Sequence, residues 1–147
     1  MEPIKFFGRD GQYAIFSNFA YTPLVIDDLR YKTGEHYFQS MKFIETDPEY
    51  AEIVRNAHTP KEAKRLGCSK EHRISRNWNS SGRVVVMERL LFCKALQNNK
   101  FRDLLLGSGE KEIVEASWDT FWGEGKTGDG ENMMGKLLGE LRKYLRR

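Results

Sequence analysis

The sequence predicts a single α+β domain over residues 1–147, mainly helical, in which short strands precede a run of helices. Three observations lead to this fold class. A chain of 147 residues suits one domain better than two. The N-terminal third alternates short apolar runs with turn-forming residues, a pattern typical of strands. From residue 35 onward, helix-capping residues and a helical spacing of apolar side chains prevail.

Short strands are expected where apolar or β-prone runs lie between turn signals. In the first third, Asp-Gly, proline and Asp-Asp separate these runs, and a further run precedes the glycine-rich part of the chain. The expected strands are 4–7, 14–16, 24–26, 29–32 and 112–116.

Helices are expected over most of the remaining chain. Asp47-Pro48 and Thr59-Pro60 each combine an N-cap residue with a proline in the first helical position. Residues 83–98 are apolar on nearly all sides, so we expect this helix to be the central buried one. The expected helices are 35–45, 48–56, 60–67, 83–98, 100–106 and 132–146.

The composition argues against a membrane protein and against a disulfide scaffold. No apolar run approaches 18 residues, and the N-terminus lacks the basic-then-apolar layout of a signal peptide. The two cysteines, Cys68 and Cys93, lie 25 positions apart and match no paired spacing. We therefore expect reduced thiols in a cytoplasmic protein.

Positive charge gathers in the middle of the chain. Residues 55–94 contain ten basic and three acidic residues, a net charge of +7, whereas the whole chain carries +3. Such a segment favours an anionic ligand such as a phosphate ester, although a solvated helix surface is the better interpretation of any single one of these side chains. The small overall charge argues against a general nucleic-acid-binding protein.

A carboxylate stands at the start of the first expected helix. Helical spacing places Glu35, Gln39 and Lys42 in one stripe, apart from the apolar face. The helix dipole favours the charged form of Glu35, which suits it to stabilise positive charge or to activate water. The alternative is an exposed acidic residue with no role beyond starting the helix, and spacing alone favours this alternative.

The stretch 118–132 is rich in glycine and leads into the last helix. Glycines let a backbone approach a ligand closely, and a helix N-terminus offers N–H groups to an anion. A flexible hairpin tip is the alternative. On the last helix Asn132, Gly135, Gly139 and Arg142 share one face, where the two glycines leave a groove for a ligand or for another helix.

A metal site is the remaining chemical possibility. Cys68 and His72, with His36 or His58, could supply zinc ligands, but their spacing matches no common zinc site. We expect no metal.

Five separated groups of residues occur in a fixed order between about Ile4 and Leu145. They are Phe16-Ser17-Asn18-Phe19; Glu35-His36-Tyr37-Phe38-Gln39 with Lys42-Phe43; Ala63-Lys64-Arg65-Leu66-Gly67; Trp78; and Asp119 with Trp122-Gly123-x-Gly125 and Gly128-x-Gly130-x-Asn132-x-x-Gly135. Together they resemble the NADAR family, also called YbiA-like. Asp129 and Glu131 depart from its pattern, in which many members carry lysines there, and this weakens the case that the last loop holds a phosphate.

The resemblance implies an activity, because members of that family are N-glycosidases. It implies hydrolysis of the bond between ribose C1 and a nitrogen in a phosphorylated ribosyl or ADP-ribosyl substrate. Two substrate classes follow: ribosylamino-pyrimidine phosphates of riboflavin synthesis, and ADP-ribose attached to guanine. No cofactor is expected, because the reaction is a hydrolysis. The alternative function is a module that binds ADP-ribose without cleaving it.

The resemblance also assigns roles to residues. Glu35 is expected to stabilise the cation-like sugar and to activate water, with Asp119 assisting it or holding the ribose hydroxyls. Trp78 and Trp122, which are most simply core residues, are expected to sandwich the base or exclude water. The residues expected to bind ribose or phosphate are Ser17, Asn18, Lys42 and Asn132.

Overall fold

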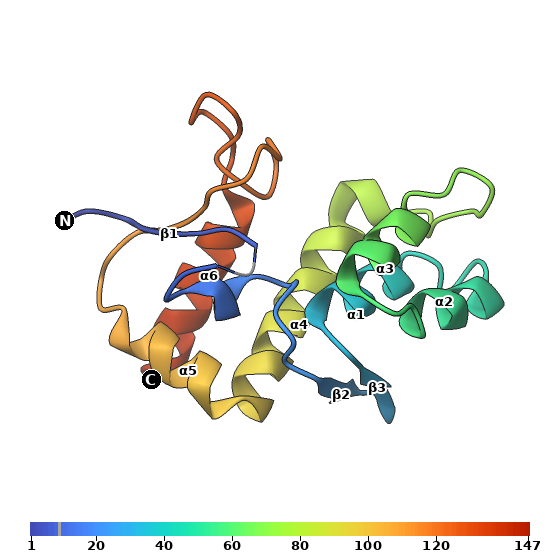
Figure 1. The fold of residues 1–147 in the computed structure, drawn as a ribbon, viewed down its shortest axis with the longest axis horizontal. Coiled ribbons are helices and arrows are strands. Elements are labelled where there is room, and N and C mark those ends of the chain that lie inside the picture. Colours follow the sequence, from blue (N-terminus) through green and yellow to red (C-terminus); the bar gives the residue numbers. More distant parts are fainter. Residues whose placement is uncertain (9) are drawn as a thin grey trace. The chain divides into compact units, whose positions relative to one another are not determined.

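The computed structural model describes residues 1–8 and 10–147 and has the mainly helical α+β fold that the sequence predicts (Figure 1). The chain divides into two compact units, residues 21–97 and residues 1–20 with 98–147, and each is described by itself. The first of these contains β2 (Leu24–Ile26), β3 (Leu29–Tyr31), α1 (Gly34–Met41), α2 (Pro48–Arg55), α3 (Pro60–Gly67), a π-helical turn η2 (Trp78–Gly82) and α4 (Arg83–Gln97). The second contains β1 (Ile4–Phe6), a 3-10 turn η1 (Ala14–Phe16), α5 (Asn99–Gly107), β4 (Ile113–Glu115) and α6 (Met133–Leu145).

Helix α1 is the most buried helix of the unit 21–97. It packs against α2, α3 and α4, and every residue from Gly34 to Ser40 is buried. Just beyond its end, Phe43 joins an apolar cluster whose other members come from α2, α3 and the segment between them. The site at the start of α1 therefore stands on a helix that is packed on several sides.

The expectation that residues 83–98 form the central buried helix is wrong. Helix α4 buries Met87, Leu90 and Leu91, but Val85 and Leu96 are 60% and 58% exposed. These two residues lie in one helical stripe with charged side chains, and that stripe faces solvent. Apolar composition therefore overstated how much of this helix is covered.

A two-residue turn joins β2 and β3 into an antiparallel hairpin, with Ile26 opposite Leu29. The turn residues Asp27 and Asp28 have φ angles of 53° and 65°. A type I′ turn requires a positive φ at both positions, and aspartate tolerates this region better than most residues do. Arg89 of α4 binds the Asp27 carboxylate at 2.7 Å. The predicted strands at 24–26 and 29–32 are confirmed.

In the other unit, β1 and β4 pair in parallel with Ile4 opposite Ile113, which confirms the strands expected there. Residues 14–16 do not form the expected strand. The N–H of Phe16 donates to the carbonyl oxygen of Tyr13 at 3.0 Å, so the segment closes a 3-10 turn. This turn buries the Phe16 ring edge-on against Phe6 and Phe101. A three-residue apolar run cannot by itself distinguish a strand from a helical turn.

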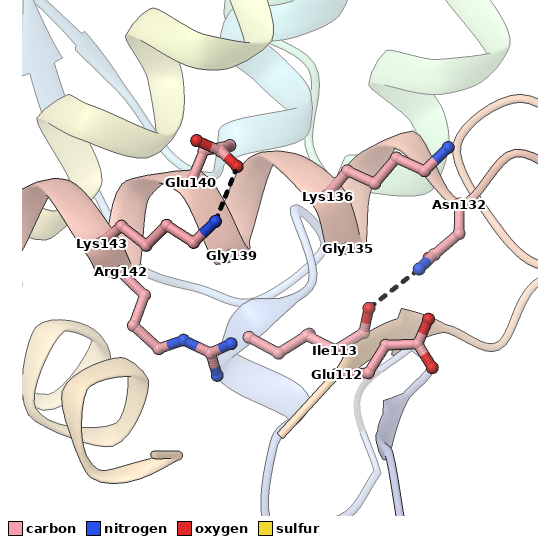
Figure 2. A pocket seen from close by; sticks show the side chains of 9 residues that line it. All are labelled: Glu112, Ile113, Asn132, Gly135, Lys136, Gly139, Glu140, Arg142 and Lys143. Carbon is pink, nitrogen blue, oxygen red and sulfur yellow. Dashed lines mark hydrogen bonds and ion pairs between the residues drawn. The ribbon is translucent and has the colours of Figure 1, made fainter. Parts of the chain in front are cut away.

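The two glycines on one face of α6 have different surroundings (Figure 2). A Cβ atom at Gly135 would lie 1.9 Å from the carbonyl oxygen of Ile113, so only glycine allows α6 to approach β4 this closely. A Cβ atom at Gly139 would meet no described atom within 4 Å. A hollow of about 230 Å³ opens beside it, lined also by Arg142. The groove expected from the glycines exists, and β4 fills only its Gly135 end.

We predict that alanine will have opposite effects at these two positions. Gly135→Ala forces a methyl group against the β4 backbone and should lower the free energy of unfolding by about 1–3 kcal/mol. Gly139→Ala removes glycine's entropy cost from an open helical position and should raise that free energy by about 0.5–1 kcal/mol. Urea unfolding of both variants measures the difference. Equal effects would show that α6 does not depend on close approach at Gly135.

Candidate active site

Thr33 and His36 fix the start of α1. The Thr33 hydroxyl oxygen accepts the backbone N–H of His36 at 3.2 Å, which makes Thr33 the N-cap. The His36 ring lies 2.8 Å from Thr33 Oγ1 through Nδ1 and 2.9 Å from the carbonyl oxygen of Ala57 through Nε2. Because a carbonyl oxygen can only accept, Nε2 carries the proton and Nδ1 accepts from the threonine hydroxyl. Burial lowers the pKa of His36, which favours the neutral ring.

Glu35 occupies the first turn of α1 and is only 7% exposed. Its Oε1 atom accepts a hydrogen bond from Nε2 of Gln39 at 2.8 Å. Burial raises the pKa of Glu35, and the bond from Gln39 and the charges of Lys64 and Lys42 oppose this shift without cancelling it. The alternative of an exposed acidic residue is therefore wrong. The loss of hydration thus opposes the charged form that the position of Glu35 at the helix start favours.

Lys42 lies one helical turn beyond Gln39, at the C-cap of α1. Its ammonium group donates to the carbonyl oxygen of Gly67 at 3.1 Å, and its side chain is half-buried. Burial lowers the pKa of Lys42, while the neighbouring Cys68 and Glu35 raise it. The stripe predicted from helical spacing therefore consists of a buried carboxylate, a buried amide and a half-buried ammonium group.

The basic segment 55–94 contributes to this surface through Lys64 of α3. Most other basic side chains of this segment have different surroundings. Arg55, Arg65 and Arg89 form ion pairs with nearby carboxylates at the surface, where such pairs add little stability. Lys94 is buried within α4, and burial lowers its pKa to about 7. For most of these side chains, the surface interpretation is therefore the better one.

Trp78 belongs to the same unit as Glu35 and Lys42. It is buried at the start of η2, and its ring centroid lies 5.0 Å from that of Phe38 on α1. Of the eight predicted site residues, the unit 21–97 thus holds Glu35, Lys42 and Trp78.

The other five predicted site residues belong to the second unit. Ser17 and Asn18 follow η1 directly and are both buried. Asp119 is exposed, and its Oδ1 atom accepts the backbone N–H groups of Phe121 and Trp122 at 2.8 and 2.6 Å. Trp122 is half-buried and meets the Phe121 ring edge-on. Asp119 and Trp122 therefore belong to one tightly bonded turn.

Asn132, the fifth residue of this group, connects α6 to β4. Its Oδ1 atom accepts the N–H of Glu115, and its Nδ2 atom donates to the carbonyl oxygen of Ile113, both at 2.9 Å. Its φ of 50° places it in the left-handed region immediately before α6. These contacts hold the strand against the helix, and the expected role of Asn132 in binding substrate stays a prediction.

The N-terminus of α6 does not offer its first N–H groups to an anion. Met133 donates to the carbonyl oxygen of Phe121 at 2.9 Å, and Met134 donates to that of Trp122 at 3.0 Å. The glycine-rich stretch folds back to make these bonds, and Gly125 and Gly128 adopt φ angles of 76° and 83° within it. The expectation of an anion site is therefore wrong for these two N–H groups, because carbonyl oxygens of the loop already accept their hydrogen bonds.

Two of the histidines considered as zinc ligands, His36 and His72, have protein partners. His72 stacks on Tyr50 with ring centroids 3.5 Å apart, and its Nδ1 lies 2.7 Å from a carboxylate oxygen of Asp47. Within residues 1–8 and 10–147, no three His, Cys, Asp or Glu side chains gather closely enough to hold a metal ion. Across the same residues, no helix has the length and apolar character needed to cross a membrane.

Two residues of the Glu35 surface were missing from the predicted site. Gln39 was detectable, because a spacing of four residues places it beside Glu35 on a helix. Gly67 belongs to a group that carries the family resemblance, but its approach to α1 depends on how α1 and α3 pack, which no sequence spacing shows.

Comparison with known proteins defines the class to which this fold and site belong. The N-glycosidase YbiA of Escherichia coli (strain K12) is 38% identical over 143 residues, which cover 97% of this chain and 88% of YbiA. The NMR structure of the E. coli protein YbiA superimposes with a TM-score of 0.87 at 36% identity, over 99% of this chain and 87% of that chain. An N-glycosidase of Nostoc punctiforme is 34% identical over 91% of this chain and 86% of its own length.

A more distant relative has a larger architecture. The chloroplastic riboflavin biosynthesis protein PYRR of Zea mays is 33% identical over 95% of this chain, which corresponds to 24% of that protein. The class that these matches define is that of hydrolases acting on N-glycosyl bonds. The NADAR domain matches residues 5–146, and the chain belongs to this family.

We predict that His36 makes the stability of the fold depend on pH. Because its pKa is lowered on folding, the unfolded chain binds more protons just below pH 6.5, and the free energy of unfolding should fall as the pH falls there. The slope contributed by His36 is at most about 1.4 kcal/mol per pH unit. In His36→Gln this contribution should be absent from urea unfolding between pH 5 and 7.5. His58→Gln, at an exposed histidine, serves as the control for the substitution itself.

Proposed function

We propose that this chain hydrolyses the bond between ribose C1 and a nitrogen of a phosphorylated ribosyl compound, with Glu35 as the catalytic carboxylate. The observation that carries the proposal is the burial of Glu35 beside an amide donor and two lysines. A buried carboxyl group whose pKa is raised is better suited than an exposed one to take up and return a proton.

The reaction needs no group beyond the protein and water. The C1–N bond breaks with its electron pair leaving on the nitrogen, and C1 becomes an oxocarbenium-like cation. The Glu35 carboxylate stabilises that cation and accepts a proton from the attacking water. The water oxygen bonds to C1, and the proton passes from Glu35 to the departing nitrogen. The products are the ribose with a hydroxyl at C1 and the free amine or base.

The lysines near Glu35 support a phosphorylated substrate. Lys42 is held by the carbonyl oxygen of Gly67, and Lys64 bears on the Glu35 charge from α3. The half-buried Lys42 ammonium group is partly desolvated, which strengthens its attraction for phosphate, whereas Lys64 is exposed. We propose that Trp78 excludes water from the site. The proposed substrate-binding roles of Asp119, Trp122, Ser17, Asn18 and Asn132 rest on the family resemblance alone.

Two substrates are proposed, and both present a ribose C1–N bond and phosphate. One is a ribosylamino-pyrimidine phosphate, which the name of the maize relative supports. The other is ADP-ribose attached to guanine. We place the protein in the cytoplasm, where its free thiols Cys68 and Cys93 would remain reduced.

We predict that Glu35→Gln will keep the fold and reduce turnover by several orders of magnitude, because the amide can neither carry the negative charge nor accept the proton. Circular dichroism checks the fold, and chromatography of the released amine or base measures turnover. Glu49→Gln is the matched control, since Glu49 also occupies a first helical turn, in α2, but is exposed. A folded Glu35→Gln enzyme with normal turnover would remove Glu35 from the mechanism.

A panel of two substrates distinguishes the proposed activities. We expect the wild-type protein to release the base or amine from a ribosylamino-pyrimidine phosphate, from ADP-ribosylated guanine DNA, or from both. Thermal stabilisation by ADP-ribose without any product from either substrate would contradict hydrolysis and would indicate a binding module instead.

A further inference from the structure

Gln39 lies between the proposed catalytic carboxylate and the last residue of a neighbouring helix. Its side chain is buried, with 4% of its surface exposed, and its Nε2 atom donates to Glu35 at 2.8 Å. On its other side, the amide faces Gly67 of α3. A Cβ atom at Gly67 would lie 2.0 Å from Oε1 of Gln39 and 2.7 Å from its Cδ. The amide therefore occupies the space that any side chain at position 67 would need.

The orientation of this amide is maintained at a cost. Its Oε1 atom is buried without a hydrogen-bond partner among the described residues. An unsatisfied buried acceptor destabilises a fold, so the placement of this amide has an energetic cost. The orientation directs the NH₂ group at Glu35, whereas the opposite orientation would put two oxygens against each other.

Gly67 receives a second group from α1. Its carbonyl oxygen accepts the Lys42 ammonium group at 3.1 Å. Glu35, Gln39 and Lys42 follow one another along a single stripe of α1, and two of the three are located by the end of α3. The contact at Gly67 thus sets the positions of the groups that surround the carboxylate.

We propose that Gln39 is a positioning residue for Glu35 and that the missing side chain at Gly67 is what allows it to act. This inference rests on the proposed catalytic role of Glu35. The hydrogen bond from Gln39 holds the carboxylate in one orientation and favours its charged form against the effect of burial. The charged groups that also face Glu35 in this unit are Lys42 of α1 and Lys64 of α3, while Cys68 bears on Lys42.

Gln39→Met tests the amide directly, since methionine has a similar length and shape but no donor. The lysines remain, so the loss of the bond should raise the pKa of Glu35 and move the acidic limb of the kcat/KM profile to higher pH. Each unit of that displacement lowers activity about tenfold at pH values below the limb. We expect kcat to fall while KM changes little. Carbon-13 NMR titration of the Glu35 carboxyl group, assigned with Glu35→Gln, measures the same shift without any substrate.

Gly67→Ala tests the second half of the proposal while Gln39 remains in place. The new methyl group displaces the amide, so the variant should show the same shifted profile and the same NMR titration as Gln39→Met. Gly107→Ala is the matched control, because Gly107 also ends a helix, α5, and a Cβ atom there meets no described atom within 4 Å. If Gly67 acts through Gln39, adding Gly67→Ala to Gln39→Ala should cause no further loss. Additive losses would overturn the proposed coupling.

The activity of Glu35→Gln and the NMR titration of Glu35 together separate this inference from the proposed function. If Glu35→Gln is inactive but the Glu35 titration is unchanged in both Gln39→Met and Gly67→Ala, the positioning role alone is overturned. Active Glu35→Gln with a shifted titration would overturn the catalytic role of Glu35 and leave the Gln39–Glu35 coupling intact.

Discussion

A carboxylate removed from water at the first turn of α1 is the constraint on which the surrounding structure depends. Burying a charged group is unfavourable unless hydrogen bonds and opposite charges compensate for the lost hydration. Around Glu35, the compensation comes from the Gln39 amide and from the positive charges of Lys42 and Lys64. Because this compensation is incomplete, the pKa of Glu35 stays raised.

The short helix α1, which carries this carboxylate, is held by many contacts within the unit 21–97. The N-cap Thr33, the His36 ring and the Ala57 carbonyl hold the helix start, and α3 packs against its Gln39 and Lys42 side. Groups on a packed helix keep their geometry better than groups on a loop. In the other unit, the stretch 118–132 is held in place differently. Its own carbonyl groups accept hydrogen bonds from the N-terminus of α6.

Local signals predicted most of the fold. The Asp47-Pro48 and Thr59-Pro60 pairs do start helices, and the Asp27-Asp28 pair does form a tight turn, because capping and turn geometry depend on neighbouring residues alone. The predictions failed where a segment's environment decided the outcome. The run 14–16 closed into a helical turn, and α4 left part of its apolar surface exposed. Neither fact is encoded within the segment itself.

By itself, the sequence determined the order of the helices and of every expected strand except 14–16, the stripe that joins Glu35, Gln39 and Lys42, and the resemblance that the family match bears out. These depend on spacing along the chain, which a sequence displays directly. Only the tertiary structure decided that Glu35 is buried, that its pKa rises, and that Gly67 meets Gln39. Hydration is lost and backbones approach closely only when helices from different parts of the chain pack together, and spacing within one helix carries no record of that packing.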